Sequence, residues 1–423
     1  MIDKLKPKSE FNRNVLTLLT GTTIAQAIPV AISPILTRIY TPEDFGIFAL
    51  FLAIISIFGS IANGRYELAI MLPEKDEDAI NIFALGLIIV SILSISLFLI
   101  IILFHDSIMQ FLNNDEIGLW LYFSPIAIFF IGFFNVLNYF NTRKKYYKNI
   151  ATSKVIKSII MAILQLLIGF FKQGPAGLII GYMMSLFFSN WKLFENILKD
   201  KELLRKISLD NIRIQAKRFI NFPKISMWGV LANTLSIQLT NMLISTFFNL
   251  STLGFYSLVQ KILGMPSTLI GGSIGQVYFQ TATKEKQQTG KTITIFMHTL
   301  KKLLIIALSV YGLLYFIVED LFAIVFGEEW RIAGIYAQLI LPLFFIRFVY
   351  ASVSTTYSIF DKLHIELIWQ ITLLFGIIAI IYIFRNDDFK VFLTYLCIYG
   401  VLLYSVSLYL VFQLSKGFSH YEK

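Results

Sequence analysis

Residues 33–73 read SPILTRIYTPEDFGIFALFLAIISIFGSIANGRYELAIMLP, and this stretch decides the fold. It contains the end of one apolar segment, the polar turn YTPED at residues 40–44, and a second apolar segment that starts at Phe45. Arg65 and Glu67 lie near the end of the second segment, where the surroundings are expected to be lipid. The stretch therefore predicts two apolar helices joined by a tight turn. The second helix is predicted to carry charged residues inside the membrane.

The composition extends this reading to the whole chain. The mean hydropathy is +0.72 and 57% of the 423 residues are hydrophobic, whereas soluble domains contain roughly 45–50% apolar residues. Uncharged runs of about 20 residues, the length that crosses a bilayer as a helix, recur along the chain. A membrane β-barrel would instead show alternating segments of about ten residues. The sequence predicts an all-α polytopic membrane protein.

We expect twelve transmembrane helices in two six-helix bundles. The first bundle is expected within residues 1–208 and the second within 209–423. The predicted helices lie at about residues 14–38, 45–71, 79–104, 118–141, 152–171, 175–194, 219–248, 252–281, 296–318, 333–359, 364–384 and 390–414.

Lysine and arginine are distributed unequally between the connections of these helices. With the N-terminus placed in the cytoplasm, twenty-eight of the 36 basic residues fall on the cytoplasmic side, five on the opposite side and three within helices. The positive-inside rule then predicts that both termini are cytoplasmic. The acidic residues of the opposite side are interpreted as solvated loop tips. Apolar residues recur in the long basic connection 195–218, which predicts a short helix on the membrane surface.

Segments on either side of this connection resemble each other at an offset of 208 residues. Gly46 aligns with Gly254 and Phe48 with Tyr256. Polar residues at helical spacing repeat at similar positions, namely Thr22, Gln26, Ser33 and Thr37 in the first helix, and Thr234, Gln238, Asn241 and Ser245 in the seventh. These stripes either form hydrogen bonds between helices or face a shared water-filled cavity. Six helices per half predict a pseudo-twofold axis along the membrane normal.

Three basic residues are assigned to the interior of the predicted helices and not to either loop side: Arg65, Lys261 and Arg347. A central arginine or lysine costs about 2.5–3.5 kcal/mol to insert, so such residues face a partner or a cavity, or reach toward the interface. Residues two apart on a helix point about 200° away from each other, so we expect Arg65 and Glu67 not to pair within one helix. The excess of cations predicts a cavity that accepts an anion, because arginine and lysine bind phosphate oxygens.

Motifs of enzymes and metal sites are missing from the sequence. The single cysteine, Cys397, excludes a disulfide framework, and the four histidines are far apart. We expect no catalytic residue, no metal and no cofactor, and the net charge of +10 reflects the loop bias rather than nucleic-acid binding. Glu67, Asp361 and Glu366 are the candidates for coupling to an ion gradient.

A family resemblance rests on two stretches. The first is ILTRIYTPEDFGIFAL from residue 35 followed by GRYELAIMLPEKDEDA from residue 64, and the second is LGFYSLVQKILGMPSTLIGGSIGQVYFQTATKE from residue 253. Together they resemble the Wzx-type O-antigen and capsular polysaccharide flippases. That family belongs to a superfamily that also contains multidrug and toxin extrusion antiporters and lipid II flippases.

The resemblance implies a location in the bacterial inner membrane and transport by alternating access. The implied substrate is an undecaprenyl-pyrophosphate-linked oligosaccharide, an O-antigen or capsular or exopolysaccharide repeat, carried from the cytoplasmic to the periplasmic leaflet. The family's cationic cavity is assigned here to Arg65, Lys261 and Arg347, with Gln26, Ser33, Gln238 and Asn241 as polar lining. Membrane lipids, a polysaccharide polymerase and a chain-length regulator are expected partners.

Two alternatives stay open at the level of sequence. A multidrug or cation antiporter of the same superfamily would need a buried carboxylate in its cavity, whereas the deep charges here are mostly positive. An oligosaccharide polymerase or ligase would need large periplasmic loops, and the predicted loops on that side are short.

Overall fold

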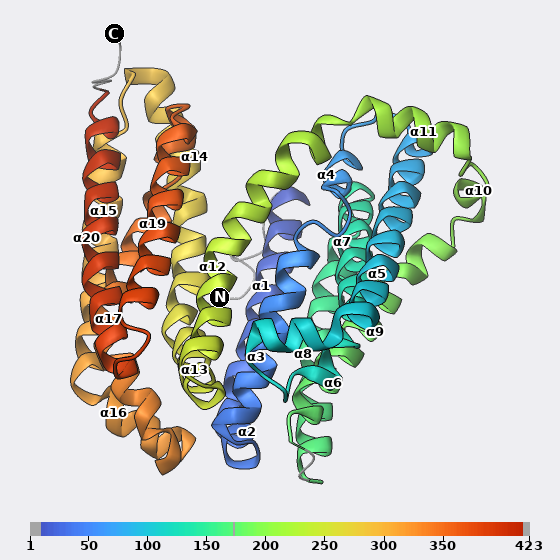
Figure 1. The fold of residues 1–423 in the computed structure, drawn as a ribbon. Helices are drawn as coiled ribbons and strands as arrows, with labels where there is room; N and C mark the ends of the chain where they lie inside the picture. The colour runs from blue at the N-terminus through green and yellow to red at the C-terminus, as the bar shows by residue number, and fades with distance from the viewer. Residues whose placement is uncertain (1–9, 172–173, 418–423) are drawn as a thin grey trace, which may run out of the picture. The chain divides into compact units, whose positions relative to one another are not determined.

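The computed structural model describes residues 10–171 and 174–417. All regular structure in these residues is helical (Figure 1). The chain packs into two compact units, Met1–Thr246 and Phe247–Lys423.

The first unit holds the helices α1 to α12. Their bounds are α1 Glu10–Ala31, α2 Ser33–Ile39, α3 Pro42–Gly59, α4 Tyr66–Ala69, α5 Asp76–Leu112, α6 Gly118–Leu121, α7 Ser124–Arg143, α8 Tyr147–Gly169, α9 Ala176–Leu198, α10 Lys201–Leu204, α11 Leu209–Arg218, the π-helix η2 Phe222–Ser226 and α12 Met227–Phe247, whose last residue falls in the second unit.

The second unit holds the remaining helices. Their bounds are α13 Leu250–Pro266, the π-helix η3 Ser267–Gly271, α14 Gly272–Thr289, α15 Ile293–Ala307, the π-helix η4 Leu308–Gly312, α16 Leu313–Phe326, the 3₁₀ helix η5 Glu328–Trp330, α17 Arg331–Val353, α18 Thr356–Ile359, α19 Leu363–Ile383 and α20 Phe389–Ser415.

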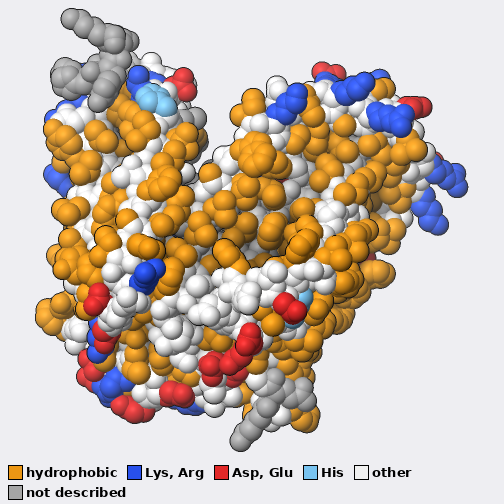
Figure 2. All heavy atoms as spheres, viewed as in Figure 1, with side chains coloured by type: hydrophobic (Ala, Val, Ile, Leu, Met, Phe, Trp, Pro, Cys, Tyr) orange, Lys and Arg blue, Asp and Glu red, His pale blue; other side chains and the backbone are white. Residues whose placement is uncertain are grey.

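Nine helical segments of the described residues are long and apolar enough to cross a membrane, so the chain is a multi-pass membrane protein. They are Thr20–Ile39, Pro42–Gly59, Asp76–Leu112, Gly118–Arg143, Tyr147–Gly169, Ile293–Phe326, Glu328–Ile359, His364–Ile383 and Phe389–Ser415. Helices α9, α12 and α13–α14 occupy the other three predicted spans, so the count of twelve stays a prediction. Hydrophobic side chains cover much of the visible face of each unit, as expected for surfaces in contact with lipid (Figure 2).

The predicted turn between the first two apolar helices is present and has a clear local cause. Thr41 accepts a hydrogen bond from the Asp44 amide, and Asp44 accepts one from the Thr41 amide, which forms a capping box at the start of α3. Pro42 fills the first helical position, where its missing N–H costs nothing. The predicted extent of this helix was wrong, because α3 ends at Gly59 rather than near residue 71.

Helix packing in the first unit is close and relies on small residues. Helix α8 packs against α1 and α9, and α7 packs against α5, α9 and α3. A Cβ atom on Gly132 of α7 would lie 2.5 Å from Val90 Cγ2 of α5, so only glycine allows this approach. A buried apolar cluster joins α5, α7, α9 and α11 through Ile80, Phe83, Leu137, Phe140, Leu193, Ile197 and Ile212.

Helix α17 is the central element of the second unit and packs against α13, α14, α15, α16 and α20. Buried tyrosines fix the surrounding helices through their hydroxyls. Tyr311 donates to the Leu263 carbonyl at 3.0 Å, and the Tyr278 and Thr356 hydroxyls are 2.6 Å apart. These bonds satisfy polar atoms that would otherwise be buried without a partner.

The start of α13 supports the predicted internal repeat. Asn249 caps α13 by accepting from the Thr252 amide at 2.7 Å, as Thr41 caps α3, and the two caps are 208 residues apart. Helix α3 ends at Gly59, and regular α-helix also ends at the corresponding point, where η3 begins at Ser267. The first packed unit extends beyond residue 208 because α11 docks on α5. A bundle boundary at residue 208 stays a prediction.

Candidate functional site

A break in the backbone after α3 creates a site in the first unit that is lined by charged and polar residues. Helix α3 ends at Gly59 and α4 begins at Tyr66, with two successive residues in the left-handed region between them, Gly64 at φ +59° and Arg65 at φ +65°. An L-residue in this region costs roughly 1–2 kcal/mol. Such strain is found where a side chain must be aimed in a particular direction.

Arg65 and Glu67 form an ion pair as a result of this break. Arg65 Nη1 lies 3.2 Å from Glu67 Oε1. The prediction that this pair cannot close was wrong, because Arg65 precedes α4 instead of lying within a continuous helix. Arg65 keeps 22% of its side-chain surface exposed and Glu67 only 4%.

These two residues line a pocket of about 450 Å³ that lies entirely within the first unit. Its walls come from the end of α3, the turn before α4, and helices α7, α8, α9 and α12. The lining residues are Ser56, Gly59, Ser60, Arg65, Glu67, Ile131, Phe134, Asn135, Tyr139, Lys157, Tyr182, Leu186 and Val230. Volume and composition fit a site for a small polar group held between apolar walls.

The charge balance of the pocket favours an anion. Its lining has two cations, Arg65 and Lys157, and one carboxylate, Glu67. Lys157 Nζ lies 5.0 Å from the centre of the Tyr182 ring, within the range of a cation–π contact. Within the described residues, Arg65 Nε and Glu67 Oε2 are buried and have no hydrogen-bond partner. The Arg65 N–H is therefore a donor that a bound anion can use.

The surroundings of Glu67 also affect the protonation of its carboxyl group. It lies between the spans Pro42–Gly59 and Asp76–Leu112, outside both. Burial raises the pKa of its carboxyl above the ordinary value, while the Arg65 guanidinium opposes this shift. Protonation of Glu67 would remove the charge that holds Arg65.

The sequence did not identify Lys157, Asn135, Tyr139 and Tyr182 as site residues. Lys157 lies inside both the predicted helix at residues 152–171 and the observed α8, but it was counted with the basic residues of the preceding connection and was therefore not considered for the site. The usable signal was the spacing of Lys154 and Lys157, which places two lysines on neighbouring positions of one helical face. Lys154 Nζ donates to Thr22 Oγ1 of α1 at 3.3 Å.

The other two basic residues predicted to bind substrate belong to the second unit. Lys261 is half-buried on α13, and Arg347 is exposed on α17 with its Cζ 5.7 Å from the centre of the Phe344 ring. Arg65 lies in the first unit, so a chamber shared by the three residues stays a prediction.

Most residues of the predicted polar stripes form hydrogen bonds along their own helices. Thr37 Oγ1 donates to the Pro34 carbonyl at 3.2 Å, and Asn241 Nδ2 donates to Gln238 Oε1 at 3.2 Å, whereas Ser33 Oγ donates across the α1–α2 junction to the Pro29 carbonyl at 2.6 Å. Gln26 is exposed on α1. The pocket around Arg65 is lined by none of the four residues predicted as polar lining, Gln26, Ser33, Gln238 and Asn241.

Of the three candidates for ion coupling, Glu67 alone lines this pocket. Asp361 is exposed, with φ +55°, in the turn between α18 and α19, and Glu366 is half-buried on α19. The roles of these two carboxylates stay predictions.

Solved structures of two kinds of transporter resemble the chain in fold. The lipid II flippase MurJ, in an inward closed conformation, aligns with a TM-score of 0.75 and 12% identity over 94% of this chain and 87% of that one. A multidrug resistance MATE family transporter of the MOP superfamily, in an inward-facing conformation, aligns with a TM-score of 0.69 and 15% identity over 94% and 93%. At these identities the likeness concerns the fold alone.

Sequence comparison adds a relative and a family. The succinoglycan biosynthesis transport protein ExoT of Rhizobium meliloti (strain 1021) is 21% identical over 316 residues, 71% of this chain and 59% of that protein. The chain thus spans less than two thirds of this relative's length. A family described as "Polysaccharide biosynthesis protein" matches residues 35–334. The chain belongs to this polysaccharide biosynthesis family.

Proposed function

We propose that this protein is a flippase for a lipid-linked oligosaccharide. The substrate is an undecaprenyl-pyrophosphate-linked unit of O-antigen, capsule or exopolysaccharide, moved from the cytoplasmic to the periplasmic leaflet of the inner membrane. Family membership and the resemblance of the fold to a lipid II flippase support this assignment. The observation that carries it is the cationic pocket around Arg65 and Lys157, placed among lipid-facing helices.

The pocket chemistry matches the parts of such a substrate. Arg65 offers a planar set of N–H donors and Lys157 a point charge, which together suit a diphosphate. Asn135, Tyr139 and the serines Ser56 and Ser60 can exchange hydrogen bonds with sugar hydroxyls. The polyprenyl tail stays in the hydrocarbon, because burying it in a polar pocket would lose its contact with lipid.

The ion pair gives the pocket a way to bind and release its cargo. Glu67 holds the Arg65 guanidinium at 3.2 Å. A diphosphate competes with Glu67 for the same guanidinium, and protonation of Glu67 favours the diphosphate. Alternating access would then present the pocket to each side of the membrane in turn, with proton coupling through Glu67. No bond is made or broken, so the protein is a transporter and not an enzyme.

Charge in the second unit completes this proposal. Lys261 and Arg347 are proposed to contribute positive potential along the substrate path, with Asp361 and Glu366 as further sites for coupling ions. The bias of basic residues toward one side supports cytoplasmic N- and C-termini. A polymerase and a chain-length regulator are proposed to act on the exported unit.

The discriminating experiment follows the lipid-linked unit after deletion of the gene. A flippase defect traps single units on the cytoplasmic side, whereas a polymerase defect still delivers single units to the cell surface. Delivery of single units in the deletion strain would contradict the proposal.

A cation antiporter is a second candidate, because Glu67 is a buried carboxylate in the pocket. That function predicts that Glu67→Gln abolishes resistance to organic cations. The flippase proposal predicts no effect of this change on such resistance.

A further inference from the structure

Helix α11 presents a basic and apolar face away from the body of the first unit. We propose that this face, defined by Leu209, Arg213, Ile214, Lys217 and Arg218, binds anionic phospholipid headgroups of the cytoplasmic leaflet. This inference does not depend on the proposed transport function, since it concerns a surface separate from the pocket.

The orientation of α11 is fixed by its opposite face. Ile212 and Gln215 are buried, and Ile212 belongs to the apolar cluster that includes Ile80 of α5. The Tyr66 hydroxyl of α4 donates to the Ala216 carbonyl at 2.9 Å. The helix therefore cannot roll without losing a buried contact and a hydrogen bond, so its outward face is defined.

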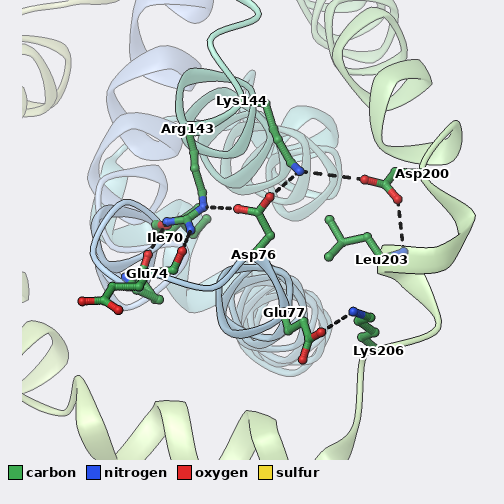
Figure 3. Close-up of polar contacts among 10 residues, drawn as sticks. Ile70, Glu74, Asp76, Glu77, Arg143, Lys144, Asp200, Leu203 and Lys206 are labelled. Carbon is green, nitrogen blue, oxygen red and sulfur yellow. Dashed lines mark hydrogen bonds and ion pairs between the residues drawn. The ribbon is translucent and has the colours of Figure 1, made fainter.

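The chain just before α11 is anchored to the N-terminal end of α5. Asn81 Nδ2 donates to the Lys206 carbonyl at 3.1 Å, and Asn81 Oδ1 accepts from the Ser208 amide at 2.9 Å. Lys206 also forms an ion pair with Glu77 (Figure 3). Ser208 in turn caps α11 by accepting from the Asn211 amide at 3.3 Å.

Further ion pairs join the start of α5 to the end of α7 and to the turn before α10. Asp76 pairs with Arg143 at 2.8 Å and with Lys144 at 2.5 Å, and Lys144 also lies 3.8 Å from Asp200 (Figure 3). The basic side chains of this network are thus engaged within the protein, in contrast to those on the outward face of α11.

The outward face of α11 combines positive charge with exposed apolar surface. Leu209 is 71% exposed and Ile214 57% exposed, and Arg213, Lys217 and Arg218 are exposed beside them. Across the described residues, none of these three cations forms an ion pair with an acidic side chain. Such a face is costly in water but suits the headgroup region of a membrane, where apolar side chains reach the acyl boundary and cations contact phosphates.

Charge and position together favour an anionic lipid over a neutral one. Each lysine or arginine near an anionic leaflet strengthens attraction by roughly five-fold. The face carries one acidic residue nearby, Asp210, against three cations. Helix α11 packs against the first turns of α5, near Ile80, and α5 is a candidate membrane span, so α11 lies near one end of that span.

The test uses the full-length protein in nanodiscs with a reporter on this face. A bimane dye is attached through Ile214→Cys in a Cys397→Ser background, since Cys397 is the only native cysteine and is buried. Nanodiscs of phosphatidylcholine receive increasing fractions of phosphatidylglycerol. We expect the dye emission to shift to the blue as the anionic fraction rises, and the shift to weaken at high salt.

A charge-matched pair of triple variants makes the test specific. The midpoint of the blue shift is the phosphatidylglycerol fraction at which half of the shift has occurred. We expect a several-fold higher midpoint for the variant Arg213→Gln/Lys217→Gln/Arg218→Gln. Lys284→Gln/Lys301→Gln/Lys302→Gln removes the same charge from exposed positions of the second unit and should leave the midpoint unchanged. Hydrogen exchange of residues 209–218 verifies that α11 stays docked in each variant.

Three results would overturn the proposal. One is emission that does not depend on the anionic fraction, and another is an equal response of both triple variants. The third is displacement of the shift by inorganic phosphate at millimolar concentration, which would show that the face takes a soluble anion instead of a lipid.

Discussion

The Arg65 guanidinium reaches the Glu67 carboxylate at 3.2 Å although only Tyr66 separates them in the chain. The contact exists because Arg65 has a left-handed backbone conformation just before α4 begins. It places one cation and one anion in the same pocket, and Lys157 leaves the pocket with an excess of positive charge.

We expect Arg65→Gln to lower the unfolding temperature more at about pH 8 than at about pH 5. Burial raises the pKa of Glu67, and removal of the opposing guanidinium raises it further. At low pH the carboxyl is neutral and its burial costs little, but as pH rises through the folded-state pKa an unpaired charge becomes buried and destabilises the fold. Thermal unfolding of the purified variant across this range checks the prediction. The double variant Arg65→Gln/Glu67→Gln should lose the pH dependence, and an equal effect of Arg65→Gln at both pH values would contradict the role of Glu67.

Lys157 provides a prediction about transport. Lys157→Gln should reduce export of the lipid-linked unit by roughly ten- to hundred-fold, the value of a hydrogen bond to a charged group. Lys148→Gln is the matched control, because Lys148 is exposed on the same helix, α8, and does not line the pocket. Surface polysaccharide is compared at equal protein level in the membrane. Equal loss in both variants would assign the effect to overall charge instead of the pocket.

Tyr66 is predicted to connect the pocket segment with α11. Tyr66→Phe removes the hydroxyl that donates to the Ala216 carbonyl and should cost about 1 kcal/mol of stability. The amides of residues 209–218 should then exchange faster. Tyr146→Phe serves as the control, since Tyr146 is exposed. Unchanged exchange in Tyr66→Phe would show that the apolar cluster alone holds α11.

Some of this organisation could be predicted from the sequence, because it follows from apolar length and local capping. The turn at residues 40–44 contains its own signals, a threonine, a proline and an aspartate at capping positions. Thr41 and Asn249, which cap helices 208 residues apart, are likewise residue types that the sequence shows as possible helix caps.

The site itself was harder to predict, for two physical reasons. The apolar run through residue 64 hides the end of α3 at Gly59, and a backbone reversal there changes the directions of Arg65 and Glu67. Lys157 was missed because it lies only a few residues from the start of the predicted helix at 152–171 and was counted with the preceding connection, whereas the structure places it at the pocket. Tertiary packing determines where the backbone is strained and how far a helix extends past its apolar section. The periodicity of apolar residues in the sequence contains no information on either.

Topology supplies a further prediction. Single cysteines at Asp115 and Lys145, introduced in a Cys397→Ser background, should be labelled from opposite sides of the membrane. Both positions are exposed, one before α6 and the other after α7. The basic bias predicts that a membrane-impermeant reagent added to intact spheroplasts labels position 115 and not position 145. The reverse pattern would invert the orientation.

Flipping is measured most directly in proteoliposomes that contain a fluorescent polyprenyl-diphosphate-linked sugar. We expect the protein and its Lys148→Gln variant to move this lipid between leaflets. Arg65→Gln/Lys157→Gln should remain folded but fail to move it. Flipping by the double variant at the rate of the unmodified protein would contradict the claim that this pocket holds the diphosphate.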